Sequence, residues 1–193
     1  MSELREGPPK PQLISEVEPI EESTNRMIVT KAQIKKLVER PLVPACEIFW
    51  DKNVETLSSS ANRKNIDRTA FIVLNFDSMS AENQAIAKEF SDPIEHDGMR
   101  TVNIEIPIKG ESVTVEEIER KAVEIAEKFK KQKMTWAPRY TIEQLREIYT
   151  IDPDDESFGV DGFVKEGYYY DEDSKLFYLS EEHFKKATEE IEE

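Results

Sequence analysis

The sequence predicts an α+β fold, in which helices pack on a small mixed or antiparallel sheet and an acidic helix–hairpin–helix subdomain follows. Two observations lead to this prediction. Between residues 27 and 135, amphipathic helical segments alternate with extended segments rich in β-branched residues. Beyond residue 136 the composition becomes acidic and aromatic. We therefore expect three parts: a tail over residues 1–26, an α+β core domain over 27–135 and a C-terminal subdomain over 136–193.

The segment 1–26 is acidic, rich in proline and poor in aromatic residues. A segment of this composition buries too little apolar surface to offset the entropy of ordering it, so we expect a disordered tail. Its apolar residues allow a second possibility, which is that the segment docks on the core as a short strand; these residues are Leu13, Ile14, Val17 and Ile20.

Four helices are predicted in the core domain, over residues 30–40, 44–50, 80–90 and 114–132. The first and the last open with capping boxes, Thr30 with Gln33 and Thr114 with Glu117. Ser80 is a single N-cap for the third helix. Prolines 41 and 44 end the first helix and open the second, since proline fits only the first turn of a helix.

Three strands are predicted between these helices: "VETLSSS" (54–60), "TAFIVLNF" (69–76) and "TVNIEIPI" (101–108). The second is apolar on both faces, which predicts a central strand covered on each side. The third alternates cleanly, but Pro107 cannot donate to a ladder. We therefore expect that strand at an edge of the sheet, or a bulge at its end. The segment "FSDPIEHDGMR" before it is predicted to be a polar loop.

In the C-terminal subdomain, Thr141 is predicted to cap a short helix and Ser180 a final amphipathic helix. Between them, "TIDPDDESFGVDGF" (150–163) is predicted to be a loop. The stretch "GYYYDEDSKLFYL" (167–179) has two aromatic runs around a polar turn, which predicts a β-hairpin.

Charge and cysteine content narrow the function classes. The net charge is −15, and residues 143–193 carry 17 acidic and five basic side chains, a net charge of −12. A segregated acidic block attracts basic partners and repels nucleic acid, so we expect no direct nucleic-acid binding. The single Cys46 excludes an intramolecular disulfide and suits the cytoplasm. We find no signal-peptide pattern and no apolar run of membrane-spanning length.

The leading hypothesis is a non-enzymatic cytosolic interaction or inhibitor-like protein whose acidic, tyrosine-rich C-terminal face binds a basic protein partner. Tyrosine offers contact area with a polar tip, and strand alternation is expected to direct some rings away from the core. The predicted partner-binding residues are Tyr168, Tyr169, Tyr170, Asp171, Glu172, Asp173 and Tyr178.

The alternative is a small enzyme or ligand-binding domain for a phosphorylated or otherwise anionic compound, using the 54–77 region. Ser58 and Ser60 would bind the anion with Arg63 as a clamp, and Asp77 would act as acid or base. The region lacks the glycines of a phosphate cradle. We expect this hypothesis to hold only if Ser58, Arg63 and Asp77 converge in one pocket. No metal site and no cofactor are predicted, since one cysteine excludes a zinc site built on thiolates.

Overall fold

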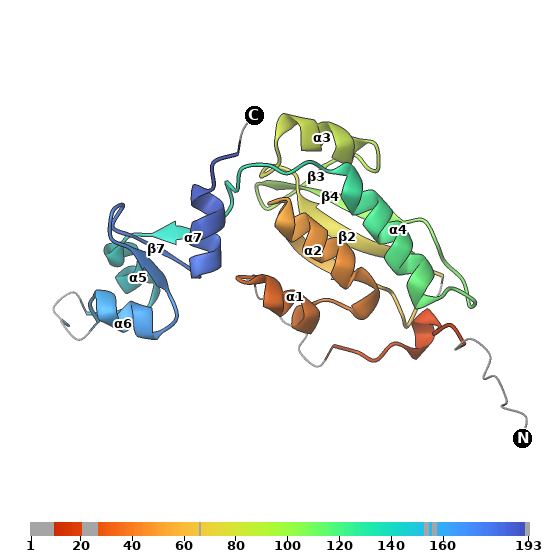
Figure 1. Cartoon of the computed structure of the whole chain (residues 1–193), viewed down its shortest axis with the longest axis horizontal. Helices are drawn as coiled ribbons and strands as arrows, with labels where there is room; N and C mark the ends of the chain where they lie inside the picture. Colours follow the sequence, from red (N-terminus) through yellow and green to blue (C-terminus); the bar gives the residue numbers. More distant parts are fainter. Residues whose placement is uncertain (1–9, 21–26, 66, 153–154, 156–157, 192–193) are drawn as a thin grey trace, which may run out of the picture.

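The computed structural model describes residues 10–20, 27–65, 67–152, 155 and 158–191 (Figure 1). Within these residues the chain forms seven α-helices and two antiparallel sheets, which confirms the predicted α+β class. Among the described helices, none is long and apolar enough to cross a membrane.

The larger sheet has four antiparallel strands in the order β1-β2-β4-β3. Their bounds are Thr56–Ser60 for β1, Ala70–Asn75 for β2, Ile94–His96 for β3 and Met99–Ile106 for β4. Strand β3 was missed, because the predicted polar loop in fact pairs with β4 as a hairpin. The turn between β3 and β4 is Asp97-Gly98, with φ of 51° and 77°. Two successive positive φ values match the right-handed twist of the flanking strands.

Helices α2 (Val43–Asp51) and α4 (Val115–Lys128) cover one face of this sheet (Figure 1). The side chains that β2 and β4 direct into this layer are buried: Ala70, Ile72, Leu74, Val102, Ile104 and Ile106. On the other face of β2, Phe71, Val73 and Asn75 are only partly buried. The prediction of cover on both sides of this strand is therefore wrong.

Strand β4 lies between β2 and β3, so the prediction of an edge strand is also wrong. The strand ends at Ile106, one residue before Pro107. The missing N–H of Pro107 consequently interrupts no ladder bond.

Helices α1 (Lys31–Leu37) and α3 (Ala81–Lys88) complete the core domain. The N-cap of α3 is confirmed, because the Ser80 hydroxyl accepts a hydrogen bond from Asn83 N. At the start of α4, Thr114 and Glu117 accept hydrogen bonds from each other's backbone N–H, as predicted.

Part of the N-terminal segment docks on the core. Leu13 forms an antiparallel bridge with Thr114, and Ile14 N donates to Val113 O over 2.9 Å. Ile14 and Val17 are buried in the main apolar cluster. Residues 10–20 thus dock on the core, but through one isolated bridge and the 3-10 helix η1 (Ile14–Glu16) and not as the short strand that was expected. Residues 1–9 and 21–26 lie outside the described residues.

The C-terminal region has its own three-stranded sheet, in the order β5-β7-β6. Its strands are β5 (Arg139–Tyr140), β6 (Tyr169–Asp171) and β7 (Leu176–Tyr178), and its helices are α5 (Ile142–Ile148), α6 (Val160–Lys165) and α7 (Glu181–Thr188). The predicted loop over 150–163 was wrong at its end, where α6 begins. A second apolar cluster is centred on Leu145, Phe163 and Phe177. The domain boundaries remain a prediction.

Candidate functional site

The hairpin of β6 and β7 is covered on both faces. Tyr169 pairs with Tyr178 and Tyr170 pairs with Phe177, so successive pairs point to opposite faces. On one face, Phe184 of α7 contacts Tyr169 and Tyr178, with ring centroids 4.7 Å and 5.3 Å away. On the other face, the Tyr170 ring lies 4.7 Å from Phe177. Tyr178 is therefore buried, while Tyr169 and Tyr170 are packed against neighbouring rings and stay partly exposed.

Tyr168 lies inside a ring cluster next to this hairpin. Its ring contacts Phe163 and Phe177 at centroid distances of 6.2 Å and 6.5 Å. Its hydroxyl is 3.1 Å from that of Tyr149. Burial raises the pKa of Tyr168 above its ordinary value, and the Tyr149 hydroxyl adds to the effect. Tyr168 thus acts first as a packing residue.

The three acidic residues of the turn differ in their surroundings. The Asp171 carboxylate accepts hydrogen bonds from the Ser174 hydroxyl at 2.5 Å and from Ser174 N at 3.1 Å. The Ser174 hydroxyl bond is the main reason that the pKa of Asp171 lies below its ordinary value. Glu172 and Asp173 are exposed. Asp171 therefore shapes the turn, while Glu172 and Asp173 present the charge.

Sequence reasoning missed an exposed apolar group in the same region. Six large hydrophobic residues are exposed among the described residues, and three of them lie on α5, α6 or the residue after α5: Ile148 (59%), Tyr149 (48%) and Val164 (46%). The Tyr149 ring lies 5.9 Å from that of Phe163, the residue that precedes Val164 in the sequence. We call Ile148, Tyr149 and Val164 the α5–α6 apolar group. The adjacent Ile148 and Tyr149 at a helix end were its only signal in the sequence.

The residues of the predicted anion site do not converge. Strands β1 and β2 are antiparallel, with Thr56 opposite Leu74 and Ser60 opposite Phe71. Arg63 follows the end of β1 and Asp77 follows the end of β2, so they lie at opposite ends of the strand pair. The antiparallel register of β1 and β2 therefore separates Arg63 from Asp77. The single pocket predicted for Ser58, Ser60, Arg63 and Asp77 is therefore wrong.

Arg63 and Asp77 also have their own partners. Arg63 Nε donates to Glu39 Oε1 at 3.1 Å, and both side chains are largely shielded, with exposures of 17% and 10%. The Asp77 carboxylate accepts hydrogen bonds from Arg100 N and Arg100 Nε, both at 2.7 Å. The backbone bond from Arg100 is the largest cause of the lowered pKa of Asp77. A carboxylate held in this way is poorly suited to proton transfer.

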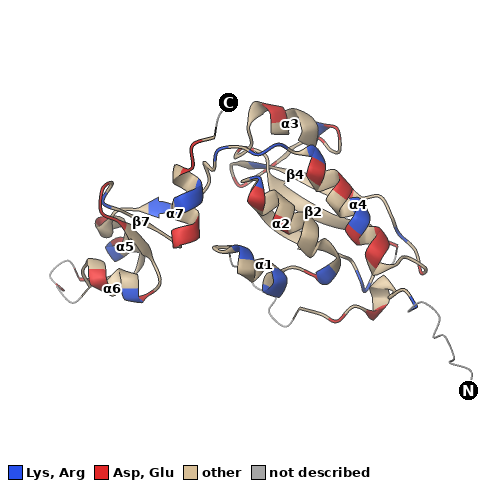
Figure 2. Ribbon diagram, viewed as in Figure 1, with Lys and Arg blue, Asp and Glu red and all other residues tan. Residues whose placement is uncertain are grey.

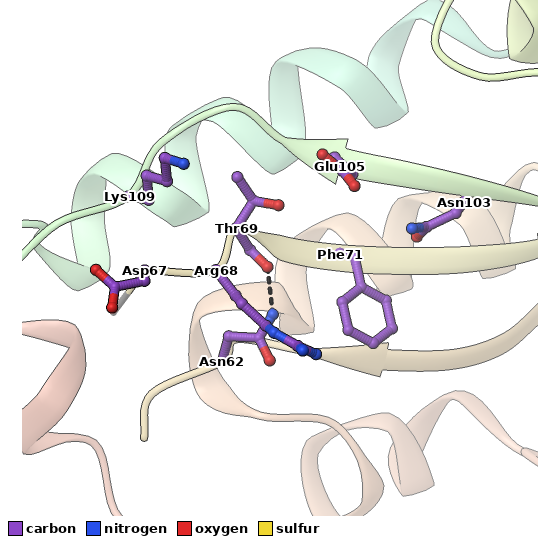
Figure 3. A pocket seen from close by; sticks show the side chains of 8 residues that line it. All are labelled: Asn62, Asp67, Arg68, Thr69, Phe71, Asn103, Glu105 and Lys109. Atoms are coloured by element: carbon purple, nitrogen blue, oxygen red, sulfur yellow. Dashed lines mark hydrogen bonds between the residues drawn. The ribbon is translucent and has the colours of Figure 1, made fainter. Parts of the chain in front are cut away.

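A pocket of about 400 Å³ lies close to the predicted region, on the sheet face away from α2 and α4. Figure 3 shows Arg68 extending towards Phe71, with Glu105 and Asn103 on the adjacent strand β4. Asp67 and Lys109 line the other end. The loop that carries Arg68 is closed by a hydrogen bond from Asn62 Nδ2 to Thr69 O (Figure 3).

The electrostatics of this pocket are mixed. Arg68 and Lys109 are cationic and Asp67 and Glu105 are anionic, and all four are exposed. In the described part of the chain, none of the four forms an ion pair. Asn103 Oδ1 is buried without a hydrogen-bond partner there. The pocket could therefore hold a compound that carries both an anionic group and hydrogen-bond donors.

Within the described ranges, no group of three or more His, Cys, Asp or Glu side chains is arranged to hold a metal ion. Comparison with protein-family models, with curated proteins and with solved structures finds no match to this chain.

Proposed function

We propose that the chain is a cytosolic interaction or inhibitor-like protein that binds a basic protein partner through its C-terminal region. The observation that supports it is the coexistence there of exposed acidic side chains with the α5–α6 apolar group. Exposed carboxylates lie on α5, on and directly after α6, and on the hairpin turn: Glu147, Asp161, Glu166, Glu172 and Asp173. Figure 2 shows the acidic segment at the hairpin turn.

The two kinds of residue have different tasks in this proposal. The carboxylates accelerate encounter with a cationic surface, in a way that salt weakens. The α5–α6 apolar group supplies contact area that is lost from water on binding. The hairpin tyrosines, which were first expected to touch the partner, contribute mainly by holding the acidic turn in place.

The proposal includes two further expectations, a cytoplasmic location and no direct binding of nucleic acid. The free Cys46 is buried, as suits a protein of the reducing cytoplasm. The negative charge of the region repels phosphates, so we expect no direct nucleic-acid binding.

The test is affinity capture at low salt, followed by elution with a salt gradient and mass spectrometry. We compare the parent chain with a Glu172→Gln/Asp173→Asn variant and a Tyr149→Ser variant. The matched control is Glu111→Gln/Glu116→Gln, which removes the same charge from exposed positions on the core domain. We expect the parent and the control to retain one basic protein in stoichiometric amount. Both test variants should bind that protein more weakly.

Two results would contradict the proposal. One is a set of scattered cationic proteins that elute together, since this indicates charge without a site. The other is equal retention of one partner by all four chains, which places its binding surface elsewhere.

A second candidate function is the binding of a small phosphorylated compound in the pocket of Figure 3. Four charged side chains surround Phe71, and their lack of ion pairs within the described residues favours it. Here Arg68 and Lys109 hold the phosphate, while Glu105 accepts from donors on the rest of the compound. Thermal-shift screening with phosphorylated metabolites tests it. A hit should be weakened about tenfold or more in Arg68→Ala, but not in Lys64→Ala, an exposed cation of the same loop.

A further inference from the structure

Helix α7 joins the C-terminal sheet to the core domain. Its consecutive residues His183 and Phe184 have different surroundings: Phe184 packs on the hairpin, whereas His183 packs on the core indoles of Trp50 and Trp136. The Ser180 hydroxyl accepts from His183 N and donates to Val29 O at 2.6 Å. The start of α7 is thereby fixed against the segment that precedes α1.

The imidazole of His183 is an unusual buried group. Its side chain is 0% exposed. It stacks on Trp50, with centroids 5.5 Å apart and planes at 27°, and meets Trp136 edge-on at 5.6 Å. Neither ring nitrogen has a hydrogen-bond partner within the described residues. Because buried polar atoms are normally paired, two unpaired nitrogens in one ring require an explanation.

The charged groups around the ring make a second cation unfavourable there. Lys186, on the same helix, already donates to Trp50 O and Asn53 Oδ1, both at 2.9 Å. Glu182 is engaged by Trp50 Nε1 at 2.7 Å and by Lys31 N at 3.2 Å. Helix α2 and the segment after α4 present the uncharged indoles, and the segment before α1 presents the Ile28 backbone. An imidazolium in this place would therefore be desolvated, and the two groups that favour it, the Ile28 backbone and the already engaged Glu182, do not offset this cost.

The pKa of His183 agrees with this geometry. Burial lowers it below the ordinary value, and Lys186 adds to the effect. The Ile28 backbone and Glu182 oppose it without reversing it. The neutral ring is thus the form that the docked helix favours.

We propose that His183 makes the docking of α7 on the core pH-dependent, so that its protonation releases the helix and uncovers Trp50 and Trp136. This device is independent of the proposed partner. It controls how the C-terminal region is held and whether two indoles of the core are accessible. The second apolar cluster of Leu145, Phe163 and Phe177 does not include α7, and we expect it to persist after release.

The direction follows from linkage. A base whose pKa is lower in the docked state takes up its proton preferentially when released. Docking is therefore at full strength above the ordinary range of histidine, about pH 6.5, and weakens as the pH falls below it. One proton can change the docking constant by at most about tenfold per pH unit.

The experiment follows the two indoles and the imidazole together. Trp50 and Trp136 are the two tryptophans of the full chain, and His96 is the only other histidine. We record tryptophan emission of the His96→Gln chain from about pH 8 to about pH 5 and, in parallel, the imidazole C–H resonances of His183. Hydrogen exchange separates release of α7 from global unfolding, since amides of β2 and β4 should stay protected.

We expect a red shift of the emission and faster exchange in α7, with the same midpoint as the imidazole titration. The His183→Phe variant keeps an aromatic ring at this position but has no titratable nitrogen, so the transition should disappear. The proposal is overturned if the emission does not change over this range, or if it changes while the imidazole does not titrate. An unaltered transition in His183→Phe would also overturn it. If that variant does not fold, the comparison of imidazole and indole midpoints decides alone.

Discussion

The indole N–H of Trp50 donates a 2.7 Å hydrogen bond to Glu182 Oε1, across 132 residues of sequence. Trp50 lies in the last turn of α2 in the core domain, and Glu182 lies in the first turn of α7 in the C-terminal region. The same carboxylate accepts from Lys31 N at the start of α1. One side chain therefore ties three helices together.

Glu182→Ala should destabilise the chain, because it leaves the N–H groups of Trp50 and Lys31 without an acceptor. We expect a loss of about 1–3 kcal/mol in the free energy of unfolding, measured by urea denaturation. Its neighbour is the control: Glu181 makes an exposed ion pair with Lys185 at 2.6 Å, so Glu181→Ala should cost less than about 1 kcal/mol. If both variants lost the same free energy of unfolding, Glu182 would not connect the three helices as described.

Gln132 connects the segment after α4 to both α2 and α3. Its Oε1 accepts from Ser80 N and Asn83 Nδ2, both at 2.8 Å, and its Nε2 donates to Asn53 O and Ser78 O. Gln132→Ala should cost at least about 2 kcal/mol, since several buried groups lose partners at once. Thermal and urea unfolding measure the loss. The adjacent exposed Lys133→Ala should change stability by less than about 0.5 kcal/mol, and a similar loss there would argue against the network.

Cys46 should be inert in the folded chain. Its side chain is 1% exposed, and burial raises its pKa to about 12, against a smaller opposing effect of a Ser59 hydrogen bond. We expect a thiol reagent near pH 8 to react about a thousandfold or more slowly than with the urea-unfolded chain, because the thiolate is scarce and covered. Rapid labelling of the native chain would mean that this part of the core opens readily.

Glu39 should be a structural residue and Arg63 its partner, in contrast to the clamp first predicted for Arg63. The Glu39 carboxylate accepts from Arg63 Nε and also from Ala61 N at 2.5 Å. Removal of one member of a shielded pair leaves the other uncompensated, so we expect Glu39→Ala to cost about 3 kcal/mol. The half-exposed Lys31–Asp51 pair is the control, and Asp51→Ala should cost less than about 1 kcal/mol. Urea midpoints of the two variants that coincide would rule out this role.

Features decided within one turn of the chain were predictable. The caps at Ser80, Thr114, Thr141 and Ser180 accept the backbone bonds expected of them, because capping depends on residues three positions apart. Periodicity likewise located the long helix α4. Strand β3 escaped detection, since it is three residues long and its Ile94 is 64% exposed. So did α6, whose sequence reads as an acidic loop with one buried ring, Phe163.

The candidate sites were less predictable, since each depends on long-range register. Arg68 and Lys109 share a pocket because β2 and β4 pair with Ala70 opposite Ile106. The same kind of pairing moves Arg63 and Asp77 apart. No sequence pattern predicts the surroundings of His183, because they come from Trp50 and Trp136, which lie far from it along the chain.

The α+β class, the starts of the capped helices, the aromatic hairpin and the concentration of negative charge after residue 143 can all be predicted without the structure. These are properties of composition and of hydrogen bonds between near neighbours. Folding in three dimensions sets which charged groups of the described residues form ion pairs, which rings are covered and which histidine is buried. Those outcomes depend on contacts between distant segments, where strand register and helix docking set the partner of each side chain.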